Sequence, residues 1–246
     1  MSTGLTPIRR RHGGLENIPR ALAVLTALLL AGIVVLVLVD RSSNTFNTSN
    51  SQGGTGSGVA ATQARSLPPF TGVNVAAGNN VVVRVGARQS VIVHADSNLL
   101  GRITTQVSSG SLVIENTPGT LNPRSPTFVA VSVPSLDALT VQGSGNISVT
   151  GISSPSLTVR VAGSGTIHAA GTTARLDAAI SGSGTVLLSR LIARDATASI
   201  NGSGRIELTA THSLDTSISG SGTILYTGNP AQVTKSVSGS DTISGG

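Results

Sequence analysis

The sequence predicts an all-β fold, a parallel β-helix that follows one N-terminal transmembrane helix. A Gly-Ser-Gly triplet recurs through the C-terminal half at intervals of roughly 20 residues, which is the length of one solenoid coil. β-branched residues, which favour extended backbone, stand at fixed distances from each triplet. Residues 21–39 form an uncharged apolar run that is long enough to cross a bilayer. Together these observations indicate a membrane-anchored stack of strands.

The triplet repeat covers residues 137–246 and predicts coils of about 19–20 residues each. Complete triplets begin at Gly143, Gly163, Gly182, Gly202 and Gly220, and a sixth copy at Gly239 reads Gly-Ser-Asp. Glycine adopts positive φ without a steric penalty, so the triplet suits a tight corner, where its stacked serines could form a hydroxyl ladder. A phosphate-binding loop would need a helix after the glycines. A strand is expected instead after each triplet.

Alternation around the triplets predicts which residues are buried. The column two positions before each triplet contains Val141, Val161, Ile180, Ile200, Ile218 and Val237. The column four positions after each first glycine contains Ile147, Ile167, Val186, Ile206, Ile224 and Ile243. Residues between the inward columns, such as Asn201, are polar or small. A period of two predicts strands with these columns inside and the intervening residues in water.

The segment before the repeats, 1–66, is expected to anchor the domain. Residues 1–20 hold Arg9, Arg10, Arg11 and Arg20 and form a predicted cytoplasmic tail, because positive flanks stay inside. Residues 21–39 are the predicted single-pass helix, which places the C-terminal domain outside the cytoplasm. A cleaved signal peptide is the alternative, although its apolar region is normally about 7 to 15 residues long. Residues 40–66, rich in Ser, Gly and Asn, are predicted to be a flexible linker.

Residues 67–246 are the predicted β-helical domain, and its first part is less regular than the repeats. Strands are expected at 73–75, 81–85, 91–93, 103–107, 112–114 and 129–133. The segment 116–126 contains three prolines, which cannot donate to a ladder, so it is predicted to protrude as a loop.

Composition excludes several functions. The net charge is +6, but residues 1–66 hold six arginines against two acids, so the excess lies mainly near the membrane. Aromatic residues are 2% of the chain, and no concentrated basic patch follows residue 66, so no nucleic-acid partner is expected. The chain has no cysteine, which excludes disulfides and thiolate chemistry.

The chain resembles the bacterial putative auto-transporter adhesin head GIN domain family. The resemblance covers roughly residues 67–228. It rests on the triplets, on the run Val91-Ile92-Val93-His94-Ala95-Asp96-Ser97-Asn98-Leu99-Leu100, and on Gly110-Ser111-Leu112-Val113-Ile114. It implies a right-handed β-helix in the cell envelope with a molecular function that is uncharacterised.

A polysaccharide-cleaving enzyme is the alternative, because parallel β-helices also serve that chemistry. Asp177 and Asp215 both stand five positions before a triplet, two coils apart, which puts their backbones about 10 Å from each other. Thr197 occupies the coil between them, and His94, His168 and His212 fit a surface role. The sequence therefore predicts no catalytic residue, no cofactor-binding residue and no metal site.

The sequence predicts a single-pass protein of the cell membrane whose extracytoplasmic domain acts by contact rather than by chemistry. Binding, adhesion and scaffolding of the envelope are the expected kinds of function. A cell-surface polymer, another protein and a second copy of the chain all remain open as partners.

Overall fold

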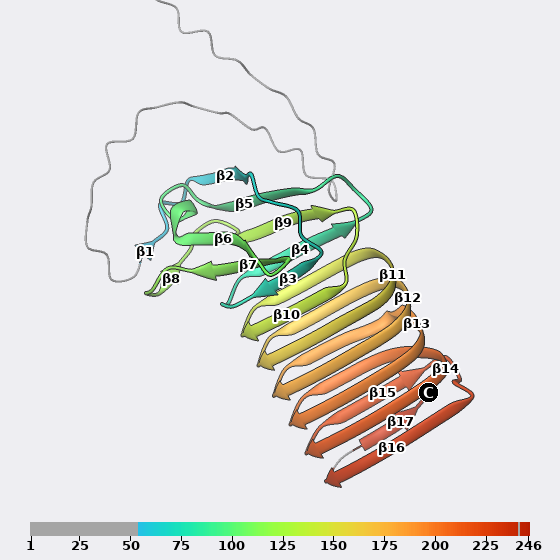
Figure 1. Ribbon diagram of the computed structural model, residues 1–246. Coiled ribbons are helices and arrows are strands. Elements are labelled where there is room, and N and C mark those ends of the chain that lie inside the picture. The colour runs from blue at the N-terminus through green and yellow to red at the C-terminus, as the bar shows by residue number, and fades with distance from the viewer. Residues whose placement is uncertain (1–53, 241) are drawn as a thin grey trace, which may run out of the picture. The chain divides into compact units, whose positions relative to one another are not determined.

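The protein's structure is a computed structural model that describes residues 54–240 and 242–246 (Figure 1). Its first strands are β1 (Gly54–Thr55), β2 (Ala60–Arg65), β3 (Gly72–Val75), β4 (Asn80–Val85), β5 (Ser90–Asp96), β6 (Ile103–Ser108), β7 (Ser111–Asn116), β8 (Leu121–Asn122), β9 (Phe128–Val133) and β10 (Ala138–Gly143). The remaining strands are β11 (Asn146–Gly163), β12 (Thr166–Gly182), β13 (Thr185–Gly202), β14 (Arg205–Gly220), β15 (Thr223–Thr227), β16 (Gln232–Gly239) and β17 (Thr242–Gly245). Within the described residues the one helical element is the short turn η1 (Leu100–Arg102). The prediction of an all-β fold is confirmed, as a β-solenoid of about five turns.

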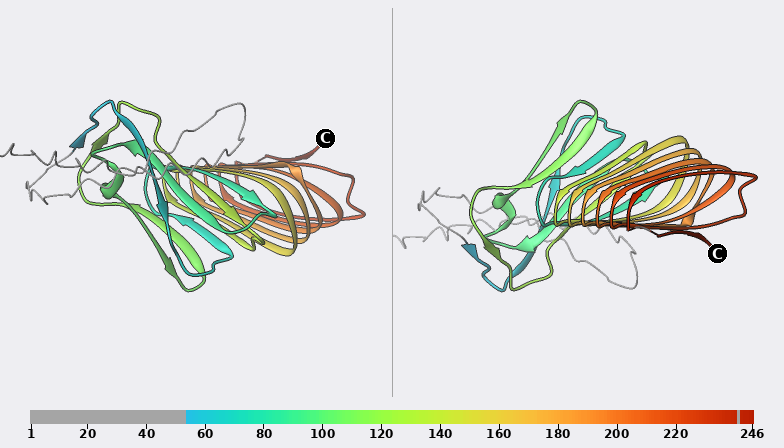
Figure 2. Two further views of the ribbon diagram at one scale, coloured as in Figure 1. Left: turned by 90° about the horizontal axis from the view of Figure 1, so that it is seen from above. Right: turned by 90° about the horizontal axis from the view of Figure 1, so that it is seen from below.

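The strands form two ladders because each long strand bends from one side of the solenoid to the other. Ladder A runs through β6, β7, β3 and β10, then the second halves of β11 to β14, and ends at β16. Ladder B runs through β2, β5, β9 and β4, then the first halves of β11 to β14, and continues through β15 to β17. Figure 2 shows the successive turns nearly end-on as flattened loops. The predicted parallel pairing of the strands is confirmed, and the right-handed sense of the β-helix remains a prediction.

The Gly-Ser-Gly triplets form the corner between the two ladders, and they stack in register from rung to rung. Gly202 has a φ of 129°, and a Cβ added there would lie 2.3 Å from the carbonyl oxygen of Gly182. A Cβ added at Gly204 would lie 2.7 Å from Cγ2 of Ile180. Gly202 is therefore required both by its positive φ and because a Cβ would clash with the backbone of Gly182. Gly204 is required because a Cβ would clash with the side chain of Ile180. The backbone N–H of Ser203 donates to Gly182 at 3.0 Å, so the ladder here is made by backbone rather than hydroxyl groups.

The inward columns form the predicted core. Every residue of the two columns from Val141 to Ile218 and from Ile147 to Ile224 is at most 3% exposed. Asn201 and the other residues directly before the triplets are exposed. Val237 departs from the prediction because it is 50% exposed. It lies in the last described rung, on which no further rung stacks.

The last rung, β16 and β17, places a lysine in an inward column. Lys235 pairs in register with buried Thr216. Its ammonium group donates to the carbonyl oxygen of Ile243 at 3.2 Å and lies 5.1 Å from the ring centre of Tyr226. An inward charge on an edge strand opposes edge-to-edge pairing, and Lys235 has this placement on β16.

Antiparallel strands close the other end of both ladders. β6 pairs antiparallel with β7, and β5 pairs antiparallel with both β9 and β2. β2 falls inside the predicted linker 40–66, so that prediction is wrong for residues 60–65. These residues form a strand because they satisfy the free edge of β5, and Arg65 donates to the carbonyl groups of Leu100 and Ile103. The Ala-Ala-Thr-Gln-Ala-Arg sequence of β2 has no apolar alternation that would reveal this pairing.

The proline-containing segment 116–126 lies on the surface as predicted, but it is tied down rather than freely protruding. Its short strand β8 pairs with β1. The backbone N–H groups of Arg124 and Ser125 donate to the buried carboxylate of Asp96, as do the Ser125 hydroxyl and the N–H of Gly58. Burial raises the pKa of Asp96, but these hydrogen bonds outweigh it and hold the pKa below its usual value.

The predicted cytoplasmic tail 1–20, the predicted transmembrane helix 21–39 and the linker residues 40–53 lie outside the described residues. Within the part of the chain that the structure describes, no helix is long and apolar enough to span a bilayer.

The assignment of faces predicts opposite effects for two neighbouring substitutions. Ile200→Asp puts an unpaired carboxylate into the core, which should lower the free energy of unfolding by about 3 to 5 kcal/mol. For a domain of this size the melting temperature should fall by about 6 to 20 °C. Asn201→Asp, on the exposed side, should change the free energy by about 0.5 kcal/mol or less. Equal shifts in thermal unfolding of the two variants would contradict the assignment.

Candidate functional site

The outward side of ladder A, from β11 to β16, is the most regular surface among the described residues, and we call it the hydroxyl face. Four rows of side chains run across its rungs in register. The first row, which we call the Thr/Asp row, contains Thr158, Asp177, Thr197, Asp215 and Thr234. On one side of it lies the row of Ser156, Arg175, Asp195, Ser213 and Gln232. On the other side lie the rows of Arg160, Ala179, Ser199, Ser217 and Ser236, and of Ala162, Ser181, Asn201, Ser219 and Ser238.

Two shallow grooves follow these rows along the solenoid. The first groove has a volume of about 460 Å³ and is walled by the Thr/Asp row and by the row of Arg175 and Asp195. Buried Leu176, Ala196 and Leu214 contribute to its lining between the two walls. The second groove, of about 510 Å³, lies between the two serine-rich rows. Both grooves exist because short side chains stand on either side of an inward-pointing residue in rung after rung.

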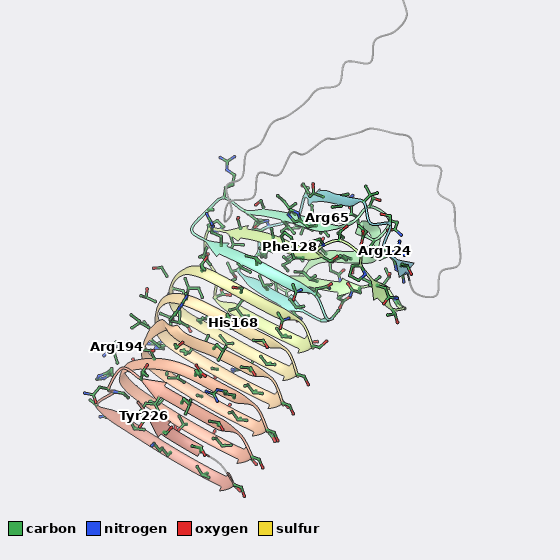
Figure 3. All side chains as sticks on the ribbon, turned by 180° about the vertical axis from the view of Figure 1, so that it is seen from behind. Arg65, Arg124, Phe128, His168, Arg194 and Tyr226 are labelled. Atoms are coloured by element: carbon green, nitrogen blue, oxygen red, sulfur yellow. The ribbon has the colours of Figure 1, made fainter. Side chains whose placement is uncertain are left out.

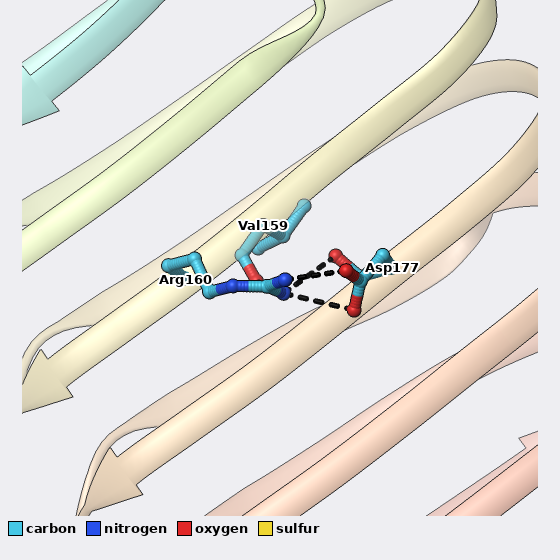
Figure 4. Close-up of polar contacts among 3 residues, drawn as sticks. All are labelled: Val159, Arg160 and Asp177. Atoms are coloured by element: carbon cyan, nitrogen blue, oxygen red, sulfur yellow. Dashed lines mark hydrogen bonds and ion pairs between the residues drawn. The ribbon is translucent and has the colours of Figure 1, made fainter.

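One ion pair joins two rungs of the hydroxyl face. The guanidinium of Arg160 donates to both carboxylate oxygens of Asp177 and to its backbone carbonyl (Figure 4). The hydrogen bonds to Asp177 raise the pKa of Arg160 above its ordinary value, although partial burial opposes the shift. The two side chains are 40% and 50% exposed, so this pair positions charge on the surface more than it stabilises the fold.

The other two carboxylates of the first groove differ in their surroundings. Asp195 accepts a hydrogen bond of 2.7 Å from the hydroxyl of Ser213 and lies 3.6 Å from the guanidinium of Arg194. Asp215 is exposed, and none of the described hydrogen bonds or ion pairs involves its carboxylate. Asp215 is therefore the carboxylate of this groove that is most open to a ligand.

The arrangement gives no support to Asp177 and Asp215 as an acid and base pair. They face the same groove, but Thr197 stands on the rung between them, so their backbones are about 10 Å apart. A general acid or base must be free to reach the substrate. The carboxylate of Asp177 is engaged by the guanidinium of Arg160, which disfavours that role.

The three predicted surface histidines are not brought together. His94 stacks on Phe128 across β5 and β9, with ring centres 4.2 Å apart, and its partial burial lowers its pKa. His168 is exposed on ladder B, away from the hydroxyl face, and appears with Phe128 among the labelled side chains of Figure 3. His212 is exposed on β14. Among the described residues, no group of three or more acidic or histidine side chains could hold a metal ion.

The sequence identified Asp177 and Asp215 but did not predict the pair of Arg160 with Asp177 or the row that Arg175 and Asp195 share. Arg160 stands three residues before Gly163, so the triplet register could have placed it beside Asp177. The stacking of His94 on Phe128 depends on an antiparallel register that the repeat does not define.

Known proteins share this architecture. The family model for "Putative auto-transporter adhesin, head GIN domain" matches residues 69–230. A putative adhesin from Bacteroides fragilis NCTC 9343 is 18% identical with a TM-score of 0.64, and the match covers 78% of this chain and 100% of that chain. A putative lipid binding protein from Parabacteroides distasonis ATCC 8503 is 24% identical with a TM-score of 0.50, over 79% of this chain and 100% of that chain. These two likenesses show a shared fold.

A search of curated proteins gave no match. The family match spans β3 to β15 and so includes strands before the repeats as well as the repeats, and it confirms the resemblance inferred from the sequence. This chain belongs to the family of the putative auto-transporter adhesin head GIN domain.

Proposed function

We propose that this protein is a membrane-anchored binding protein that presents its β-solenoid outside the cytoplasm, where the hydroxyl face contacts a component of a cell surface. Membership of an adhesin-like family supports a role in surface binding or adhesion. We choose this face because four rows of mainly small polar side chains lie in register across five of its strands. Such a surface offers polar donors and acceptors at regular intervals along the solenoid and therefore suits a repetitive partner.

Ladder B is a weaker candidate for the binding face. Its outward row of Ser148, His168, Leu187, Glu207 and Leu225 mixes sizes and polarities from rung to rung. Glu207 is also engaged by Arg205 at 2.7 Å. The outward side of ladder A has both grooves described above, whereas this row lines neither.

The proposed role is contact rather than cleavage. Of the three carboxylates in the first groove, Asp177 is paired with Arg160, and Asp195 accepts a hydrogen bond from Ser213. A hydrolytic pair needs one carboxylic acid and one carboxylate across the scissile bond. The ion pair of Asp177 with Arg160 favours binding over the alternative of a polysaccharide-cleaving enzyme.

The proposed anchor is the apolar segment 21–39, with the N-terminus in the cytoplasm. Its N-terminal flank holds Arg9, Arg10, Arg11 and Arg20, whereas the other flank has Asp40 and Arg41. This asymmetry favours a cytoplasmic tail and an extracytoplasmic domain. The segment 40–53 then separates the anchor from β1, which begins at Gly54.

Protease accessibility tests the anchor. Protease added to intact spheroplasts should degrade the domain and leave a short N-terminal fragment that contains residues 1–39. An antibody against an N-terminal tag would detect the protected fragment. Protection of the whole chain would contradict the orientation, and a secreted form that lacks the segment 1–39 would indicate a cleaved signal.

Paired arginine substitutions test the binding face. Ser199→Arg with Ser217→Arg places two bulky cations on adjacent rungs of the hydroxyl face. Binding of residues 54–246 to isolated envelopes of the producing bacterium, measured by co-sedimentation, should fall at least about 10-fold because the side chains block the face. The control is Thr166→Arg with Thr185→Arg, which adds the same charge to adjacent rungs of ladder B.

The control variant should bind as the unmodified domain does. Equal binding by both double variants would show that the binding site lies outside the hydroxyl face. Failure of the unmodified domain to bind envelopes would contradict the proposed function itself.

A further inference from the structure

We propose that the first groove binds an extended, uncharged β-1,4-linked glycan chain that lies along the solenoid axis. This inference rests on the proposed function, since it names the class of partner for the hydroxyl face. It follows from the repeat of the Thr/Asp row, from the chemistry of the groove lining and from its charge.

The repeat of the Thr/Asp row matches a two-residue polymer repeat. Hydroxyl and carboxylate side chains alternate along it, with Asp177 and Asp215 separated by Thr197. Adjacent parallel strands are about 4.8 Å apart, so the carboxylates recur at about 10 Å. In an extended β-1,4-linked glycan each sugar is turned over relative to the last, so the chain presents the same edge at every second sugar. One sugar would therefore lie on about one rung.

The lining of the groove offers the contacts that neutral sugars need. A carboxylate accepts two hydrogen bonds, and threonine hydroxyls both donate and accept. Asp215 lacks a hydrogen-bond partner among the described contacts and is exposed in the groove. Leu176, Ala196 and Leu214 lie between the polar walls but are at most 4% exposed, so the contacts offered to a sugar are mainly the polar ones.

The charged residues of the first groove indicate which class of polymer it can bind. The lining of the first groove contains three carboxylates but one guanidinium, that of Arg175. Arg160 and Arg194 pair with two of these carboxylates from outside the lining, so the groove has no excess of positive charge that would attract uronic acid polymers, phosphate-linked polymers or nucleic acids. A protein partner would favour aromatic anchors, and the groove lining contains none. A neutral glycan is therefore the occupant that fits both the charge and the repeat.

The groove crosses five rungs, from Ser156 and Thr158 to Gln232 and Thr234, and is about 19 Å long. Affinity should therefore rise with chain length up to about five sugars and then level off. This length dependence distinguishes a chain that lies along the groove from a single sugar at one rung.

Titration calorimetry with residues 54–246 tests the inference. All buried side chains of the described core come from residues 70–224, so this part contains its own core. Chitohexaose and cellohexaose are the probes, and both should bind. Laminarihexaose, which is β-1,3-linked, and an oligogalacturonate, which is acidic, should bind at least about 10-fold more weakly.

Asp215→Ala should weaken binding of the bound hexaose by about 10-fold or more, because it removes two acceptors from the wall of the groove. Glu115→Ala is the matched control, since Glu115 is an exposed carboxylate on β7 outside the groove. It should leave the affinity unchanged, and thermal unfolding should show that both variants are folded.

Two outcomes would overturn the inference: absence of binding of both β-1,4-linked hexaoses at millimolar concentration, or equal effects of Asp215→Ala and Glu115→Ala. If the domain still binds envelopes through the hydroxyl face in either case, the proposed function stands with another partner. If envelope binding is also absent, the proposed function fails with it.

Discussion

Glycine stacks closely on glycine at the corner between ladders A and B, and this contact organises the whole solenoid. A Cβ at Gly220 would lie 2.3 Å from the carbonyl oxygen of Gly202, and Gly182 has the same relation to Gly163 at 2.6 Å. Positive φ at these glycines turns the chain from ladder A into ladder B. Because each corner from Gly163 onward repeats the contact, successive rungs share one register on both sides of this corner, and register shifts are confined to the opposite bend. The inward columns and the outward rows both follow from it.

The hydroxyl face is a consequence of this register. A row such as Thr158, Asp177 and Thr197 exists because residues at one offset from the triplet are stacked directly on each other. Small residues beside the row leave grooves above the inward positions. The chain can thus vary its outward side chains without changing the stack, and the face becomes the place where a partner can be selected. Arg160 and Asp177 show that such variation can also link neighbouring rungs.

Sequence patterns predicted the repeats well because one local motif determines both the corner and the alternation. Ile200 and Asn201 lie on the sides that period-two alternation assigns to them. The ends were harder to predict. β2 forms because it pairs with the free edge of β5, and Val237 is exposed because no described rung covers it. Both features depend on which strands are neighbours in space, which the local sequence does not reveal. The carboxylates Asp177 and Asp215 could be placed on one face, but the pairing of Asp177 with Arg160 required side-chain positions.

The corner needs glycine at its first position and not at its middle one. Urea unfolding of Gly202→Ala and Ser203→Ala measures this most directly, since the second residue is exposed at the same corner. We expect a loss of about 2 to 4 kcal/mol for Gly202→Ala, from strain at positive φ and from the contact with Gly182. For Ser203→Ala we expect a change of about 0.5 kcal/mol or less. Equal free energies of unfolding for the two variants would contradict the claim.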